Sequence, residues 1–152
     1  MKGLIQRVTR ASVTVDGEIT GSVSTGLLVL LGVEKNDSQV EASALCGKVI
    51  SFRLFADSSN RMNRSLEHIG GSLLIVPQFT LVADTSSGTR PGFSRAAGPQ
   101  LAHELYDVFV GVARDRLGAA RVECGRFGAD MKVSLVNDGP ATFLLEVSCG
   151  SN

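Results

Sequence analysis

The feature that most constrains this fold is a continuous apolar run at residues 26–33 (GLLVLLGV). A run this short, bounded by glycine, predicts a strand that is buried on both faces. The residues before it also suggest strands, because apolar and hydroxyl side chains alternate over residues 11–15. Asp16 and Gly17 then form a hairpin signal that leads into a second strand at Glu18–Val23.

Two helices are expected farther along the chain. Asp37 and Ser38 can cap a helix over about residues 39–52. Its predicted inward stripe consists of Val40, Ala44, Leu45 and Val49. Pro99 suits the first turn of a second helix, and Gly118 ends it. The apolar residues at helical spacing between them are Leu101, Leu105, Val108, Phe109 and Val112.

The remaining patterns again predict strands. One is expected at residues 72–82, before a loop rich in Gly, Ser and Thr, and another at residues 131–135. After a predicted turn at residues 137–140, apolar positions alternate from Phe143 to Val147. With 43% apolar and 20% charged residues, residues 1–152 are expected to form one β-rich α+β domain. Its strands should form largely antiparallel sheets or an open barrel, with two main helices.

Composition excludes several classes of protein. No 18-residue apolar run occurs, and the N-terminal apolar run is too short for a signal peptide, so a cytoplasmic protein without a membrane segment is expected. Fifteen basic residues balance fifteen acidic ones, which argues against gripping long nucleic acids. A local patch that touches a nucleic-acid end remains compatible with this balance, with Arg90 and Arg95 as candidates.

The usual catalytic sets are missing from the sequence. The two histidines lie in no metal-binding pattern, and no phosphate-binding Gly-rich loop is present, so no metal and no cofactor are expected. The three cysteines, Cys46, Cys124 and Cys149, form no Cys-x-x-Cys pair and are expected to be buried small apolar residues.

Two short segments are unusual for purely structural ones. At residues 77–81 (Pro-Gln-Phe-Thr-Leu) a proline interrupts a good strand, and Gln78 and Thr80 would share one face. At residues 137–142 (Asn-Asp-Gly-Pro-Ala-Thr) the composition is that of a turn. On spacing alone, an ordinary strand and an ordinary hairpin turn explain both segments.

Taken with residues 5–8 (Ile-Gln-Arg-Val) and 125–131 (Gly-Arg-Phe-Gly-Ala-Asp-Met), these segments make the chain closely resemble the D-aminoacyl-tRNA deacylases. The resemblance extends from Met1 to about Val147. It implies a homodimer with a compact β-rich fold that binds the 3′ end of aminoacyl-tRNA. Family members hydrolyse the ester between a D-amino acid and tRNA, and many also remove glycine from mischarged tRNA, here expected to be tRNA-Ala.

The resemblance also implies roles for individual residues. Gln78, Phe79 and Thr80 would form the catalytic segment, with backbone N–H groups near Phe79 and Thr80 as donors to the oxyanion. Gly139 and Pro140 would form a cis peptide that reaches into the partner subunit's pocket and excludes L-amino acids. The implied substrate-binding residues are Met131, Asn137 and Arg7, of which Arg7 would steady the Gly-Pro loop.

Several alternatives stay open from the sequence. Phe79 and Met131 could be core residues, and Arg7 could lie on a strand surface. Thr80 as a covalent nucleophile is a rival to a positioning role, although no histidine partner or N-terminal amine is evident for it. A non-catalytic module that binds charged tRNA ends and a structural β-rich dimer are rival functions.

One position departs from the family pattern. Pro77 stands where the family usually has serine, and it therefore lacks both a hydroxyl and a backbone N–H. A sister branch of the superfamily also carries proline there and rejects L-amino acids less strictly. The resemblance therefore leaves the strictness of D-selectivity open.

Overall fold

The computed structural model describes residues 1–150. Its strands are β1 (Lys2–Val15), β2 (Glu18–Val23), β3 (Gly26–Gly32), β4 (Phe55–Ala56), β5 (Met62–Arg64), β6 (Ser72–Pro77), β7 (Val122–Cys124) and β8 (Lys132–Glu146). Its helices are α1 (Gln39–Ser51), α2 (Leu66–Ile69) and α3 (Pro99–Leu117), with short 3₁₀ turns η1 (Phe79–Val82) and η2 (Ala119–Arg121). The predicted α+β class and the two main helices, α1 and α3, are confirmed.

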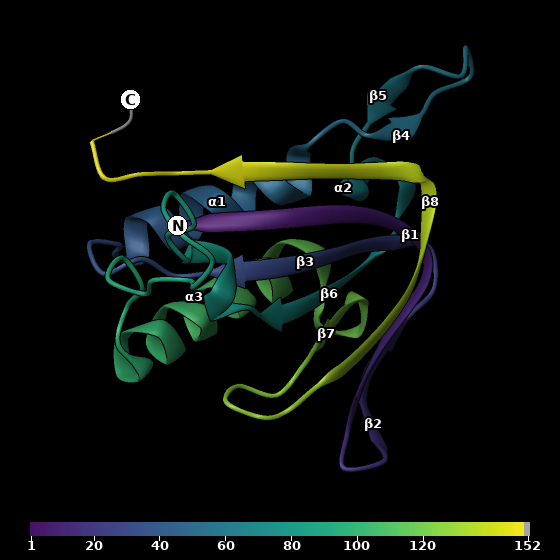
Figure 1. Cartoon of the computed structure of the whole chain (residues 1–152). Helices are drawn as coiled ribbons and strands as arrows, with labels where there is room; N and C mark the ends of the chain where they lie inside the picture. The colour runs from purple at the N-terminus through teal and green to yellow at the C-terminus, as the bar shows by residue number, and fades with distance from the viewer. Residues whose placement is uncertain (151–152) are drawn as a thin grey trace.

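One strongly curved sheet organises the molecule. Its strand order is β2-β1-β3-β6-β7, and β8 pairs with the other edge of β1. The pairings of β1 with β2, β3 and β8 are antiparallel, as predicted. The β3–β6 and β6–β7 pairings are parallel, because helical connections carry the chain back to the start of the sheet in each case. Figure 1 shows β8 sweeping around the sheet, with α1 and α3 against one of its faces.

The predicted double burial of β3 is confirmed, and it explains the two layers of core. Leu27, Val29 and Leu31 pack with the buried faces of α1 and α3. Leu28, between them on the strand, faces the other way into a second cluster with Val8 and other β1 and β6 residues. Successive side chains of a strand alternate between faces, so one apolar run supplies both cores. Within residues 1–150, no helix is long and apolar enough to cross a membrane.

The predicted stripe of α1 was correct for Leu45 and Val49 and wrong for Val40 and Ala44, which are exposed. Ser38 caps the helix as the sequence indicated, and the structure adds Glu41 as its partner in a capping box. The buried apolar face consists of Ala42, Leu45, Cys46, Val49 and Ile50. These five positions follow the helical period, and Val40 falls on the opposite side of the first turn.

The expectation that all three cysteines are buried was wrong for one of them. Cys46 lies in the core and Cys124 is half-buried, whereas Cys149 is exposed after the end of β8.

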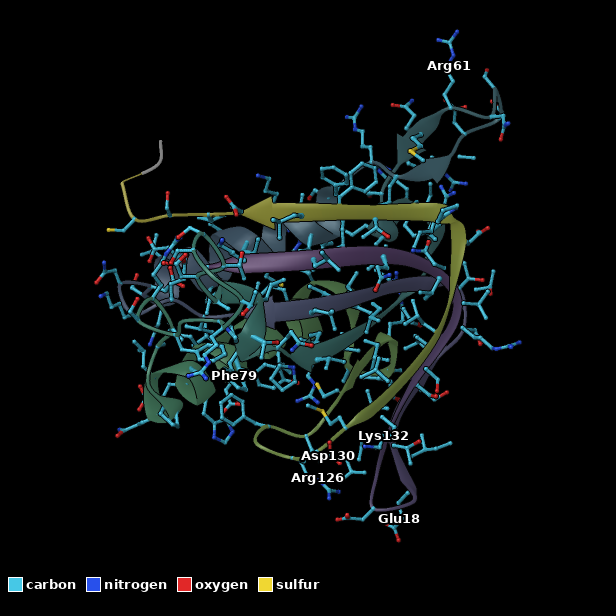
Figure 2. The ribbon with its side chains drawn as sticks, in the orientation of Figure 1. Glu18, Arg61, Phe79, Arg126, Asp130 and Lys132 are labelled. Atoms are coloured by element: carbon cyan, nitrogen blue, oxygen red, sulfur yellow. The ribbon has the colours of Figure 1, made fainter. Side chains whose placement is uncertain are left out.

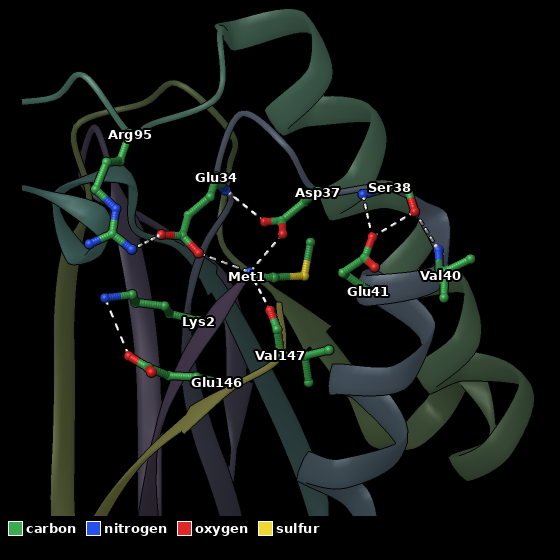
Figure 3. A network of polar contacts seen from close by, with 10 residues as sticks. All are labelled: Met1, Lys2, Glu34, Asp37, Ser38, Val40, Glu41, Arg95, Glu146 and Val147. Atoms are coloured by element: carbon green, nitrogen blue, oxygen red, sulfur yellow. Dashed lines mark hydrogen bonds and ion pairs between the residues drawn. The ribbon is translucent and has the colours of Figure 1, made fainter. Parts of the chain in front are cut away.

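The α-ammonium group of Met1 is buried at the start of β1 (Figure 3). It donates to Asp37 Oδ1 at 2.7 Å, to Glu34 Oε2 at 3.2 Å and to the Val147 carbonyl at 2.7 Å. The other oxygen of Glu34 accepts from Arg95 Nη2 at 2.7 Å. Burial alone raises the pKa of Glu34, but the ammonium and Arg95 lower it overall. One buried charge thereby joins the start of β1, the loop before α1, the segment before α3 and the end of β8.

This network predicts that Asp37→Asn destabilises the fold. Asp37 Oδ2 accepts from the Glu34 amide while Oδ1 accepts from the ammonium, so an Asn NH₂ group would face a donor at either position. The loss of a hydrogen bond to a charged group lowers the free energy of unfolding by about 1.5–3 kcal/mol, which corresponds to a fall of roughly 3–10 °C in the midpoint of thermal unfolding. Exposed Asp115→Asn on α3 is the matched control, and equal midpoints for both variants would contradict the prediction.

Candidate active site

The first candidate segment lies where β6 ends. The predicted strand over residues 72–82 was too long, because β6 stops at Pro77 and a 3₁₀ turn follows. The Gln78 amide donates to the Leu31 carbonyl at 2.8 Å, so the Pro77 nitrogen faces the opposite side, toward β7. Strand β7 has already ended at Cys124, and the missing N–H of Pro77 therefore breaks no ladder bond.

The 3₁₀ turn brings the three predicted catalytic residues together. The Gln78 side-chain amide donates a hydrogen bond to the Thr80 hydroxyl. The side chain of Phe79 is 62% exposed and packs against Phe93, with ring centroids 5.3 Å apart. The backbone N–H groups of Phe79 and Thr80 open the turn and have no hydrogen-bond partner within residues 1–150. This segment thus presents two free donors beside an exposed aromatic ring.

A cavity of about 680 Å³ adjoins this segment. The first candidate segment contributes Pro77, Gln78 and Phe79 to its wall, whereas Thr80 does not line it. The other walls come from the ends of β3 and β6, the start of α3 and the loop before β8. These lining residues are Leu31, Val33, Val76, Phe93, Ala96, Ala97, Pro99, Ala102, Tyr106, Phe127, Gly128, Ala129, Met131 and Val133. Its size and its mostly apolar wall suit a small-molecule moiety such as a nucleoside.

The polar groups behind this wall are already satisfied. The Tyr106 hydroxyl donates to the Ile75 carbonyl at 2.9 Å, and burial raises the pKa of Tyr106 well above its usual range. Burial also raises the pKa of the Cys124 thiol. Both groups therefore stay protonated and neutral near pH 7, which makes them poor candidates for a base or a nucleophile.

Two aromatic residues of the cavity were missed from the sequence. Phe93 lies in the Gly- and Ser-rich loop, and Phe127 lies in the segment before β8 and stacks on His103 at 4.4 Å. Neither belongs to a periodic element, so hydrophobic patterning gives no signal for them. For Phe127 the family-like segment 125–131 was the one available indication. Within residues 1–150, no group of three or more His, Cys, Asp or Glu side chains could hold a metal ion.

The second candidate segment is a bulge inside β8 and not the hairpin turn that was predicted. Gln6 pairs with Thr142 and Val8 pairs with Asn137, so residues 138–141 bulge out opposite the single residue Arg7. The chain does not reverse, since both halves of β8 pair with β1 in the same direction. The Gly139-Pro140 peptide within the bulge is cis.

Side chains hold this bulge, which we call the Gly-Pro loop (residues 138–141). Asn137 closes it with both ends of its amide, donating to Thr142 Oγ1 at 2.7 Å and accepting from the Ala141 N–H at 2.8 Å. Arg7 Nε donates to the Asp138 carbonyl at 2.8 Å. The structure therefore places Asn137 and Arg7 as braces of the loop within one chain.

The two candidate segments do not meet within one chain. Arg7, opposite the Gly-Pro loop, pairs with Leu27 at one end of β3, whereas Gln78 hydrogen-bonds to Leu31 at the other end. These β3 residues alone are roughly 13 Å apart along the strand. Met131 lies with Gln78 and Phe79 at the cavity, whereas Asn137 and Arg7 lie with Gly139 and Pro140 at the loop.

Comparison with known proteins gives this arrangement a family. A family model described as D-Tyr-tRNA(Tyr) deacylase matches residues 4–146, nearly the whole chain. The chain belongs to this family. It is 64% identical to a D-aminoacyl-tRNA deacylase of Marinobacter nauticus over 146 residues, covering 96% of this chain and 94% of the relative. It is 56% identical to a D-aminoacyl-tRNA deacylase of Escherichia coli K12 over 147 residues, covering 97% of this chain and all of the relative.

Two solved structures share the fold of this chain. The c-Myc DNA unwinding element binding protein superposes with a TM-score of 0.93 at 36% identity, covering 98% of this chain and 100% of that one. A probable eukaryotic D-amino acid tRNA deacylase superposes with a TM-score of 0.86, covering 96% and 98%. At 17% identity, this second likeness supports the family fold alone.

Proposed function

We propose that this chain, a D-aminoacyl-tRNA deacylase by family, hydrolyses the ester between a D-amino acid and the 3′ end of tRNA, and also clears glycine mischarged on tRNA-Ala. The observation that carries the proposal is the turn at Gln78–Thr80, which has two unpaired backbone donors and contributes Gln78 and Phe79 to the wall of an apolar cavity. Such a cavity fits the terminal adenosine and the attached amino acid. Because aminoacyl-tRNA is used in translation, the proposed reaction would take place in the cytoplasm.

The reaction needs little from the protein, because an aminoacyl ester is already activated. A fixed substrate, donors for the developing oxyanion and an attacking water suffice. The N–H groups of Phe79 and Thr80 supply the donors, and Gln78, held by Thr80, binds ribose or ester oxygens. The free hydroxyl of the terminal ribose can orient the water, so neither a metal nor a histidine base is required.

Substrate selection is assigned to the Gly-Pro loop of a second subunit. The loop projects at the end of the sheet away from its own cavity, which supports a homodimer in which each loop reaches the partner's cavity. The Gly139 and Pro140 carbonyls would then face the substrate's α-carbon on the side where an L side chain projects. Glycine and D residues pass this barrier, so selection by exclusion needs no pocket for each side chain.

The first test is deacylation of matched D-Tyr-tRNA, L-Tyr-tRNA and Gly-tRNA by the purified protein without added metal. We expect rapid loss of the D and glycyl esters with the L ester spared. Loss of all three would keep the enzyme class and implicate Pro77 in relaxed chirality. Tight binding with no loss of any ester would contradict catalysis and support a binding module.

Thr80→Ala should separate a positioning role from a nucleophilic one. Without the hydroxyl, the Gln78 amide loses its acceptor, which corresponds to roughly a tenfold fall in kcat/KM for D-Tyr-tRNA. Thr80→Ser keeps the acceptor and should restore most of the activity. A fall of more than about 10⁴-fold in kcat with KM unchanged would instead identify Thr80 as a nucleophile.

Gly139→Ala should weaken chiral rejection. Gly139 has φ +140°, and an added Cβ would lie 2.9 Å from Arg7 Nη2 and 3.0 Å from the Ala141 nitrogen. The loop would therefore shift off its Arg7 brace. We expect the D/L ratio of kcat/KM to fall by about tenfold or more, the equivalent of one braced hydrogen bond. Gly88→Ala, in open space at φ +66°, is the matched control, and an unchanged ratio in both would count against the loop's role.

A further inference from the structure

A short hairpin, β4–β5, stands away from the body of the molecule (Figure 1). Its root is anchored, because Leu54 is fully buried and Phe55 is 6% exposed. Beyond the root, residues 58–64 are all exposed, including Met62 at 51%. Such a small two-stranded element contributes little core and adds little to its own stability. A projecting arm of this kind is better explained by a partner than by packing.

The charge on this arm is positive within a chain of zero net charge. Residues 53–64 carry three arginines, Arg53, Arg61 and Arg64, and one acid, Asp57. The Asp57 carboxylate is used in the turn, where it accepts from the Ser59 and Arg61 amides. These hydrogen bonds, that from the Arg61 amide foremost, lower the pKa of Asp57. The acid therefore shapes the tip of the hairpin, and the three arginines are left as its recognition groups.

Each of the three guanidinium groups has donors to spare. Arg53 makes one hydrogen bond, to Asn63 Oδ1 at 3.2 Å, and Arg64 makes one, to the His68 carbonyl at 2.8 Å. Within residues 1–150 the Arg61 guanidinium has no hydrogen bond or ion pair. Figure 2 shows Arg61 at the outer end of the hairpin. Arginine forks of this kind fit phosphate oxygens.

The arm is tied to the Gly-Pro loop by one side chain. The Arg7 guanidinium donates through Nη1 to the Leu54 carbonyl at 2.5 Å and through Nε to the Asp138 carbonyl at 2.8 Å. The root of the hairpin and the loop are therefore held as one unit. Figure 2 places Arg61 far from Phe79 of the same chain, so the arm serves the site that the loop serves.

We infer that the β4–β5 hairpin is a phosphate-binding arm, in which Arg53, Arg61 and Arg64 contact the backbone of the tRNA whose 3′ end occupies the partner subunit's cavity. This inference rests on the proposed function and adds where the body of the tRNA lies. Of the candidates expected from the sequence, Arg95 is paired with Glu34, and Arg90 is a single exposed arginine, whereas the hairpin has three. The cavity contacts only the 3′ end of the tRNA. Binding of the rest of the tRNA therefore depends on a basic surface such as this hairpin.

The test compares two substrates, D-Tyr-tRNA and the D-tyrosyl ester of adenosine, which has no stem. Arg61→Gln should raise KM for D-Tyr-tRNA about three- to fivefold, and Arg53→Gln/Arg61→Gln should raise it further. Each lost contact should reduce the slope of log KM against log salt by about one. Kinetics with the adenosine ester should be unchanged, and Arg61→Lys should recover part of the loss.

Arg114→Gln is the matched control, since Arg114 is an exposed arginine on α3 and not on the hairpin. The inference is overturned if the hairpin variants affect both substrates equally, if they affect neither, or if light scattering shows that they change the assembly. If the wild type cleaves neither ester, the proposed function fails. The arm is then judged by fluorescence binding of uncharged tRNA, where an equal affinity of wild type and Arg53→Gln/Arg61→Gln overturns it.

Discussion

The register shift between the paired strands β1 and β8 is the constraint on which the rest of the structure depends. Lys2–Gln6 pair regularly with Thr142–Glu146, and Arg10–Thr14 pair regularly with Lys132–Val136, with a second register shift between Val8 and Arg10. Between Gln6 and Val8, one residue of β1 lies opposite four residues of β8, and the excess must leave the sheet. Because regular pairing resumes on both sides, the position of the resulting loop is fixed by the ladder and does not depend on a flexible connection.

Arg7 is the side chain that connects the loop produced by this register shift to the rest of the molecule. As the single β1 residue opposite the excess, it lies below the loop, and its planar group reaches both the loop and the root of the β4–β5 hairpin. A lysine could not hold two carbonyls in divergent directions in the same way. The molecule thereby has two regions of different chemistry: an apolar cavity at one end of β3, and a polar loop with a basic hairpin at the other.

The sequence predicted those features of the fold that depend on local pattern or capping. The cap at Ser38, Pro99 in the first turn of α3, the two helices and the doubly buried β3 all follow such rules. It failed at Pro77, where the apolar residues beyond the proline still resemble a strand although the chain has turned. It also failed at residues 137–140, because turn residues specify local backbone angles and not whether the chain reverses. The family resemblance indicated three of the residues that line the cavity, Gln78, Phe79 and Met131. Phe93 and Phe127 reach the cavity by tertiary packing that no local pattern encodes.

The contact between Met1 and Val147 spans 146 positions of the chain, and it bears on how the protein is made. Strand β8 covers one whole edge of β1, yet it is synthesised after every other strand of this sheet. Until it emerges from the ribosome, β1 presents an open row of N–H and C=O groups, and its terminal ammonium lacks one of its acceptors. Closure is therefore a late, long-range event, which is slow compared with local helix formation. During this interval, nascent chains on neighbouring ribosomes of one mRNA could pair with one another through their exposed β1 edges.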